Sequence, residues 1–498
     1  MDKLRLRNYR CFDDTGDIEL KPITLLLGAN SSGKSSFIKF FPLLQQSLET
    51  RVNGLFLWDG QYVDFKDFKN TVRNGNGEIV IDYTIGSLEA SLMYRRRSQI
   101  LTNVIVSMTL SEKESYYDYL KELTIRYEDV SIKYHFTKEG KSCSIETNGI
   151  KSTEFPTEKI SIVFDNNLLP SIRFEYESSD FKISGFISQL ALSELNELIG
   201  KKKRTGIDLL LNESDSKLFS YDYKKILDEV KKRMPNESEE KIVRAANIQI
   251  YLMSGLLVNS VNDYFANLSK RFSYVLPLRS IMNRYYRFQN RNVDSIDPDG
   301  GNLAMFLNSL TEKKMEELNE WLFDIFKFRL SITKSEGHVE LYIEEENKPK
   351  RNLVDVGFGF TQILPILTII WKFVYGSRVE VAFNHKVTPV TIAIEQPELH
   401  LHPRFQAYFA QMLAKVMENC KKKKIQLRII IETHSEVLIN KLGQLIFDSS
   451  TGLSKEDVGV VLFNANKEGL DNYVHTTGFS DDGGLINWPF GFFSEDVY

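Results

Sequence analysis

The sequence contains little cysteine, with only Cys11, Cys143 and Cys420 among 498 residues. Three cysteines at such wide and irregular spacing form neither a disulfide framework nor a metal-ligand motif, and this usage is typical of a reducing compartment. A run of about 18 uninterrupted apolar residues, which a membrane-spanning helix requires, is also missing. The first residues, MDKLRLRNYRCF, are charged where a signal peptide needs an apolar segment. We therefore expect a cytoplasmic protein that does not enter a membrane.

An excess of one charge is missing as well, because 63 Lys and Arg residues stand against 67 Asp and Glu residues, for a net charge of -4. This balance excludes a strong overall field toward nucleic acid or anionic lipid, so any contact with DNA must come from local patches. Clusters of basic residues are usually solvated surface, although each one here could touch a phosphate backbone. A contact with DNA therefore stays open. The basic clusters lie at residues 95–97, at residues 201–204, and at residues 421–424 with Arg428.

The sequence also lacks an internal repeat, a low-complexity tract and a heptad pattern sustained over many turns. Without sustained heptads, long coiled-coil arms are excluded. With 42% hydrophobic and 26% charged residues, the composition is that of an ordinary globular protein. The length allows two or three domains.

Hydrophobic patterns divide the sequence into four segments. Strands and helices alternate in the first and last segments, short alternating runs bounded by turn residues fill the second, and helix formers dominate the third. This order predicts an α/β protein with an antiparallel β region and a helical insertion. The four segments are residues 1–75, 76–186, 187–272 and 273–498. Within the first and last segments, strands are expected at residues 23–27, 389–394 and 427–431, and helices at residues 35–48 and from Pro403.

A glycine- and serine-rich loop matches the phosphate-binding pattern GxxxxGK[ST], after the first predicted strand and at the start of a helix. In such a loop backbone N–H groups point at phosphate oxygens, Lys34 reaches the β and γ oxygens, and the hydroxyl of Ser35 ligates Mg²⁺. A turn that fits the pattern by chance is the alternative. The predicted ATP-binding residues of this loop are Gly28, Ala29, Asn30, Ser31, Ser32, Gly33, Lys34, Ser35 and Ser36.

A second apolar strand ends in Glu395 and is followed by the loop QPELHLHP. A carboxylate at the carboxyl end of a neighbouring strand can hold the water shell of Mg²⁺ opposite Ser35, so we assign Glu395 to Mg²⁺. Gln396 stands where the catalytic Glu of an Asp-Glu pair is expected, and an amide can orient water but cannot accept its proton. Either Glu398 acts as the base, or hydrolysis is slow.

Two further loops precede predicted helices. Residues 352–365, NLVDVGFGFTQILP, place glycines at a helix start that would offer N–H donors to an anion, although a plain capping loop is the alternative. In ETHS, His434 could hydrogen-bond the γ-phosphate or the attacking water as a neutral imidazole, unless the segment only caps a helix. The predicted nucleotide contacts of the first of these loops are Gly357, Gly359, Thr361 and Gln362.

Taken in order, these motifs resemble the ABC-type P-loop ATPases of the SMC, RecF and OLD branch, and especially the ATPase subunits of bacterial anti-phage systems such as PARIS, Septu and Gabija. The stretches LRLRNYRCF, YVLPLRS, EQPELHLHP, ETHSEVLI and WPFGFFSED add to the likeness. The resemblance implies an ABC-type head that is at least a dimer, with ATP and Mg²⁺ between Lys34 of one subunit and residues 357–362 of the other. It also implies that Arg7 and Tyr9 lie near the adenine and that Gln61 is a Q-loop residue at Mg²⁺.

The resemblance leaves three functions open. The first is an ATP-hydrolysing sensor and scaffold that controls a separate effector, a nuclease or toxin, in anti-phage defence. For this function we expect no attached nuclease, because too few residues follow His434 for the Toprim domain of OLD proteins. The second is a RecF-like or SMC-like ATPase that acts directly on DNA in repair or maintenance. The third, which Gln396 favours, is a nucleotide-dependent interaction protein that does not hydrolyse ATP.

Overall fold

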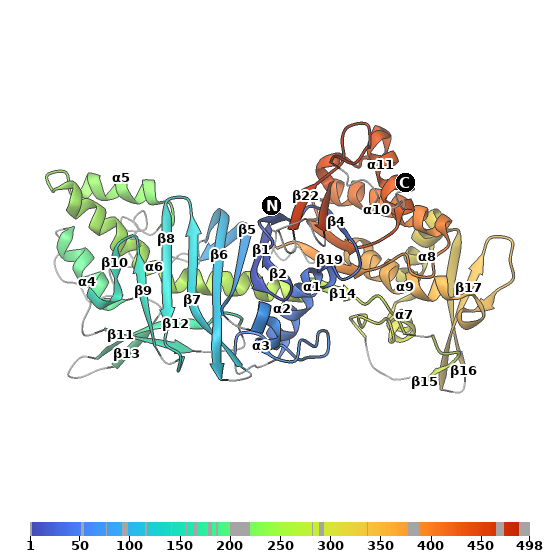
Figure 1. Cartoon of the computed structure of the whole chain (residues 1–498), viewed down its shortest axis with the longest axis horizontal. Helices are drawn as coiled ribbons and strands as arrows, with labels where there is room; N and C mark the ends of the chain where they lie inside the picture. Colours follow the sequence, from blue (N-terminus) through green and yellow to red (C-terminus); the bar gives the residue numbers. More distant parts are fainter. Residues whose placement is uncertain are drawn as a thin grey trace. The chain divides into compact units, whose positions relative to one another are not determined.

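The computed structural model shows two compact units, of which unit 1 comprises Met1–Asp17 and Leu43–Lys270, and unit 2 comprises Ile18–Pro42 and Arg271–Tyr498 (Figure 1). The basic clusters at residues 95–97 and 201–204, and the WPFGFFSED stretch, lie outside the described residues. The structure describes residues 2–50, 54–75, 77–91, 98–114, 117–140, 142–154, 158–163, 167–177, 182–185, 188–199, 220–280, 282–287, 293–335, 337–376, 388–464 and 473–487.

Unit 2 is organised around a mixed sheet that has six strands in its described part. In sheet order these are β14 (Phe272–Val275), β19 (Val390–Glu395), β20 (Leu427–Glu432), β4 (Ile23–Gly28), β21 (Val458–Asn464) and β22 (Tyr473–Thr477). All neighbours are parallel except β21 and β22. Every residue of β19, β20 and β4 is buried, which explains why these strands are nearly continuous apolar runs. The three strands predicted for this part of the sequence are confirmed.

The helix predicted at residues 35–48 is divided into α1 (Lys34–Ile38) and α2 (Phe40–Glu49). Pro42 has no N–H to donate to the carbonyl of Ile38, so a continuous helix would lose a hydrogen bond there. The break therefore has a local cause that the helical periodicity did not reveal. Helix α1 packs against β4, β19 and β20, and this contact brings the phosphate loop close to the ends of these strands.

Other helices of unit 2 surround the same core. Pro403 starts α10, as predicted. Residues 358–376 are long and apolar enough to cross a bilayer, but 67% of that segment is buried inside the chain. The helices are α7 (Leu303–Ser309), α8 (Glu312–Phe326), α9 (Phe358–Trp371), α10 (Pro403–Lys423) and α11 (Glu436–Phe447). A small antiparallel sheet is formed by β15 (Tyr286–Arg287), β16 (Phe328–Ser335), β17 (His338–Glu345) and β18 (Arg351–Asn352).

Unit 1 contains the predicted antiparallel β region together with the predicted helices. Its long sheet has the order β10 (Ile150–Lys151), β9 (Cys143–Thr147), β8 (Val130–Phe136), β7 (Tyr117–Tyr127), β6 (Ser98–Glu114), β5 (Ile79–Ser91), β1 (Lys3–Tyr9) and β2 (Phe12–Asp14). A second sheet consists of β11 (Glu158–Val163), β12 (Ser171–Glu177) and β13 (Lys182–Gly185). Helix α6 (Glu239–Lys270) packs against β5, β9 and β12, and α4 (Gln189–Leu198) and α5 (Tyr223–Arg233) pack on α6. The predicted fold class, α/β with an antiparallel region and a helical insertion, is confirmed.

A buried carboxyl group ties a loop of unit 1 to the long sheet. Asp118 on β7 accepts hydrogen bonds from the backbone N–H of Leu55 at 3.1 Å and from the indole N–H of Trp58 at 3.3 Å. Burial raises the pKa of Asp118 to about 6, from an ordinary 3.8, although these hydrogen bonds oppose the rise. At a pH between these two pKa values, Asp118 is protonated in the folded chain and ionised in the unfolded chain.

The stability of unit 1 should therefore fall as the pH rises from about 4 to about 6 and level off above that. The unfolded chain binds fewer protons than the folded chain in this window, so the slope of the unfolding free energy with pH is negative. Asp118→Asn cannot ionise and should lose this part of the slope. Urea unfolding at several pH values, followed by tryptophan fluorescence that includes Trp58, measures the difference. Equal slopes in both proteins would contradict the prediction.

Candidate nucleotide-binding site

The phosphate loop joins β4 to α1 and requires both of its glycines. A Cβ atom on Gly28 would lie 2.2 Å from the backbone oxygen of Phe463 on β21, a distance that real contacts do not show. Gly33 precedes α1 with φ of 103°, in the left-handed region that favours glycine. Alanine at either position would force the loop to move. The loop is therefore shaped by its neighbours, and phosphate binding by its residues stays a prediction.

Lys34 is buried at the start of α1. Its Nζ atom donates hydrogen bonds to the carbonyl oxygens of Gly28 at 2.9 Å and Ala29 at 2.7 Å. Burial lowers the pKa of Lys34, and the charges of Glu432 and Glu398 oppose that change. The amino group is thus held at the loop by two neutral oxygens. A phosphate group would offer it stronger, charge-assisted hydrogen bonds.

Ser35 bonds a carboxylate that the sequence analysis missed. Its hydroxyl donates to Oε1 of Glu432 at 3.0 Å. Glu432 ends β20, the strand between β4 and β19. The residue is 3% exposed, and its Oε2 atom has no hydrogen-bond partner in the described part of the chain. Burial and, second, the charge of Glu395 raise the pKa of Glu432 to about 7.

Glu395 ends β19 in register with Glu432 on β20. Its side chain is buried, and Oε1 accepts a hydrogen bond from the hydroxyl of Tyr274 on β14. Burial raises the pKa of Glu395, while the bond from Tyr274 lowers it. Two carboxylates therefore end neighbouring strands beside the phosphate loop. The assignment of Glu395 to Mg²⁺ stays a prediction, and Glu432 is the carboxylate that contacts Ser35.

Gln396 has an unusual backbone conformation at the same edge. Its φ is 45°, in the left-handed region, and its N–H donates to the backbone oxygen of Glu432 at 2.8 Å. A non-glycine residue in this region costs about 1 kcal/mol or more, so surrounding contacts must hold it. Arg279 supplies two of them, since Nη2 donates to the oxygen of Glu395 at 2.8 Å and Nη1 to that of Gln396 at 3.4 Å.

Arg279 also joins this turn to the predicted signature helix. Its backbone N–H donates to Oε1 of Gln362 on α9 at 3.4 Å. The side chain is buried, and burial lowers its pKa to about 10, although Glu398 and Glu395 oppose the change. The guanidinium group therefore keeps its charge at neutral pH. Its role was not visible in the sequence, where it contributed only to the YVLPLRS stretch.

Glu398 connects the acidic loop to the segment that contains His434. One of its oxygens accepts from the backbone N–H of His434 at 2.7 Å, and the other accepts from the hydroxyl of Thr433 at 2.8 Å. Burial raises the pKa of Glu398, and these hydrogen bonds oppose the rise. Burial and the charge of Lys34 lower the pKa of His434, which favours the neutral imidazole. In this arrangement Glu398 positions the predicted switch histidine, and its role as a base stays a prediction.

The predicted signature loop exposes only part of its residues. Gly357 and Phe358 lie on the surface at the start of α9, and the ring of Phe358 is 6.1 Å from that of His400. Thr361 and Gln362 are buried, and the Thr361 hydroxyl donates to the carbonyl of Phe358 at 2.7 Å. The exposed part of this loop is therefore its start, at Gly357 and Phe358. Contacts of Thr361, Gln362 and Gly359 with a nucleotide stay predictions.

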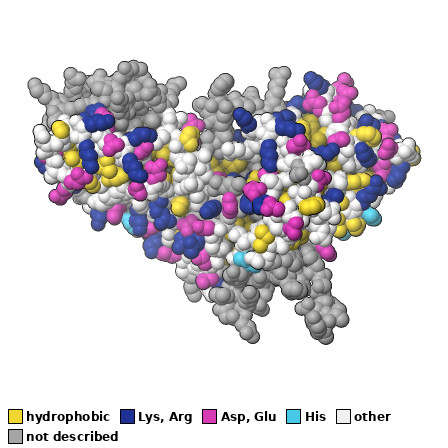
Figure 2. Space-filling view, turned by 90° about the horizontal axis from the view of Figure 1, so that it is seen from above, with side chains coloured by type: hydrophobic (Ala, Val, Ile, Leu, Met, Phe, Trp, Pro, Cys, Tyr) yellow, Lys and Arg dark blue, Asp and Glu magenta, His cyan; other side chains and the backbone are white. Residues whose placement is uncertain are grey.

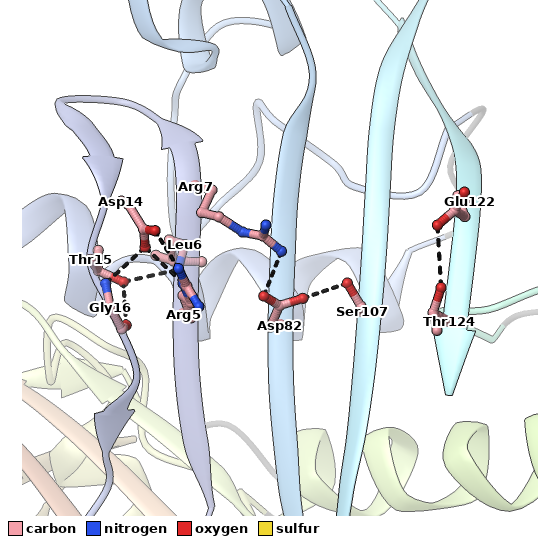
Figure 3. Close-up of polar contacts among 10 residues, drawn as sticks. All are labelled: Arg5, Leu6, Arg7, Asp14, Thr15, Gly16, Asp82, Ser107, Glu122 and Thr124. Atoms are coloured by element: carbon pink, nitrogen blue, oxygen red, sulfur yellow. Dashed lines mark hydrogen bonds and ion pairs between the residues drawn. The ribbon is translucent and has the colours of Figure 1, made fainter. Parts of the chain in front are cut away.

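The residues predicted to lie near the adenine belong to unit 1. Figure 3 shows Arg7 pointing at Asp82 on the neighbouring strand, with Nη2 at 2.7 Å from Oδ2 of that carboxylate, which also accepts from Ser107. Tyr9 is buried, with its ring 6.2 Å from that of Phe65. Gln61 is exposed. The nucleotide roles of Arg7, Tyr9 and Gln61 stay predictions.

Residues of the basic cluster at the end of α10 form ion pairs within the chain. Lys421 pairs with Asp457 at 2.5 Å, Lys422 pairs with Glu418 at 2.6 Å, and Arg428 is buried. Positive charge in the last turn also suits the helix dipole. These contacts account for Lys421, Lys422 and Arg428, and a contact of the cluster with DNA stays a prediction.

A phosphate loop at the start of α1, with carboxylates ending the adjacent parallel strands, defines a P-loop ATPase. The chain belongs to the AAA ATPase domain family AAA_15, whose model matches residues 1–439. The resemblance that the motifs predicted is thereby confirmed at the level of the family.

A curated relative and solved structures add to the comparison. Endonuclease GajA of Bacillus cereus (strain HuB5-5) is 24% identical over 229 residues, which are 43% of this chain and 30% of that protein. The match therefore spans less than a third of GajA. The Smc head domain of Pyrococcus furiosus, solved with an extended coiled coil and the C-terminal domain of ScpA, has 12% identity, coverage of 96% of this chain and 97% of that chain, and a TM-score of 0.33. The SMC head domain from Thermotoga maritima has 9% identity, coverage of 96% and 98%, and a TM-score of 0.32. The α/β fold follows from the strand order of unit 2 and from the family match.

Proposed function

We propose that the chain binds ATP with Mg²⁺ at the phosphate loop, hydrolyses it slowly, and uses the cycle to control a separate effector, a nuclease or toxin, in anti-phage defence. The observation that supports nucleotide binding is that Lys34 and Ser35, at the start of α1, lie beside the carboxylates that end β19 and β20. The buried Oε2 atom of Glu432 and the buried hydroxyl of Ser32 have no hydrogen-bond partner in the described ranges. Such atoms fit a site that is completed by a bound ligand and ion.

In this proposal the residues of the site divide into those that bind the phosphates and Mg²⁺ and those that act on the attacking water. Lys34 exchanges its two carbonyl partners for the β and γ oxygens, and Ser35 and Glu395 hold Mg²⁺. When bound, Mg²⁺ neutralises charge that develops on the phosphates. Gln396 orients the attacking water, Glu398 accepts its proton or positions His434, and His434 donates to the γ-phosphate or water. Turnover is slow because an amide occupies the position of the usual base.

The proposed active unit is a dimer. The exposed Gly357 and Phe358 at the start of α9 offer N–H donors and an apolar side chain to a second copy of the chain. ATP on Lys34 of one copy would then complete its contacts at residues 357–362 of the other. Nucleotide binding would in this way change the association of the subunits, which an effector can sense. We propose the cytoplasm as the compartment.

The defence role rests on the partial likeness to Endonuclease GajA and on the sequence motifs. Direct action on DNA has less support, since basic and acidic side chains are interspersed on the face that Figure 2 shows. Gln396 favours one further candidate, a nucleotide-dependent interaction protein that does not turn ATP over.

Phosphate release by the purified chain, together with its mass distribution in mass photometry, tests these proposals with and without ATP and double-stranded DNA. Slow turnover and ATP-dependent dimers support the switch. DNA-stimulated turnover without any partner would favour the DNA-acting ATPase. ATP-dependent dimers without turnover would favour the interaction protein. No nucleotide-dependent change of any kind would overturn the proposal.

A further inference from the structure

The acidic edge of unit 2 contains more negative charge than a single Mg²⁺ carboxylate explains. Glu395 and Glu432 end neighbouring strands in register, and both are 3% exposed. Two buried carboxylates at adjacent positions repel each other unless one of them is protonated or a cation lies close to both. The nearest cationic group on the loop, Lys34, donates to backbone carbonyls.

Glu432 has one oxygen engaged and one free. Oε1 accepts from Ser35, whose hydroxyl is the predicted Mg²⁺ ligand, and Oε2 is buried with no hydrogen-bond partner among the residues that the structure describes. A buried, unpartnered carboxylate oxygen is costly, and such atoms usually mark a bound ion, a water or a catalytic role. The Glu432 carboxylate therefore lies beside Ser35, the predicted Mg²⁺ ligand, and its Oε2 atom is available to coordinate an ion or a water.

We propose that Glu432 is a second carboxylate for the nucleotide-bound Mg²⁺, acting with Ser35 directly or through a bound water. This inference rests on the proposed ATP site and adds to it a residue that neither the motifs nor the family match assigns. Among the described residues, no group of three or more His, Cys, Asp or Glu side chains could hold a metal ion alone. The ion would therefore arrive with the phosphates, as is usual for Mg²⁺, which keeps waters and takes one or two carboxylates.

The test separates binding of the nucleotide from binding of the ion. The affinity for a fluorescent ATP analogue is measured in excess EDTA and in Mg²⁺, and the ratio of the two gives the Mg²⁺ enhancement. Glu432→Gln should leave the affinity in EDTA equal or tighter, because a negative charge is removed. The Mg²⁺ enhancement should fall about 10- to 100-fold, as is typical when a group that supports a metal ligand is lost. Glu436→Gln, an exposed carboxylate on α11, is the matched control and should behave as wild type.

An unchanged Mg²⁺ enhancement in Glu432→Gln would overturn this inference while leaving the ATP site intact. It would mean that Glu432 only accepts the hydrogen bond of Ser35, which a Gln side-chain oxygen can also do. Wild-type protein that binds no ATP in either condition would overturn both the inference and the proposed function. If Glu432→Gln does not fold, Glu432→Ala replaces it, and wild-type enhancement in that variant, which has no carboxylate, would also overturn the inference.

Discussion

Lys34→Ala should weaken ATP binding by about 10- to 100-fold, the factor that corresponds to loss of a charge-assisted hydrogen bond worth about 1.5 to 3 kcal/mol. In the structure the Lys34 amino group bonds only the neutral carbonyls of Gly28 and Ala29, so a phosphate would be its first anionic partner at the loop. Titration with a fluorescent ATP analogue measures the loss, and turnover should disappear with it.

A matched control excludes a general effect of removing a lysine. Lys415 on α10 is about half exposed and pairs with Asp324 at the surface, so Lys415→Ala should bind ATP as wild type does. The melting temperature of Lys34→Ala should fall modestly, because the carbonyl of the buried Gly28 loses its donor, whereas that of the exposed Ala29 can bond water instead. Undiminished ATP affinity in Lys34→Ala would mean that the loop is not the nucleotide site.

Arg279→Ala should lower the free energy of unfolding by about 2 to 4 kcal/mol, since it leaves the carbonyls of the buried Glu395 and the half-buried Gln396 without their charged donor. It should also reduce turnover more than ATP affinity. Gln396 has a left-handed backbone that the two bonds restrain, and the residue that orients water would lose its fixed position. Urea unfolding, ATP affinity and phosphate release measure the three effects.

Two further variants test the cause of the Arg279 effect. Arg284→Ala removes an exposed arginine that pairs with Asp355, and such surface pairs contribute about 0 to 1 kcal/mol, so stability and turnover should hardly change. Arg279→Lys keeps the charge, but its single ammonium nitrogen does not reproduce the planar fork with which Nη1 and Nη2 bond the two carbonyls, so it should resemble the alanine variant in turnover. Wild-type turnover in both Arg279 variants would show that the turn at Gln396 does not depend on this side chain.

Several features could be predicted from the sequence because they depend on neighbouring residues. The phosphate loop needs glycines and a lysine at fixed offsets, and the buried strands appear as nearly continuous apolar runs, two of which end in Glu395 and Glu432. The start of α10 at Pro403 is equally local, since proline fixes φ and needs no hydrogen-bond donor there. Even the break before α2 has a local cause in Pro42, although the periodicity concealed it.

The tertiary structure alone decided which residues meet. Only the strand order places β20 between β19 and β4 and so brings Glu432 to Ser35, almost 400 residues away in the sequence. The contacts of Arg279 with the turn at Gln396 and with α9 likewise join segments that no spacing relates. The sequence alone therefore determined the loops and strands, because these depend on neighbouring residues. The tertiary structure determined which residues form the site, because the pairing of strands depends on the packing energy of the whole unit.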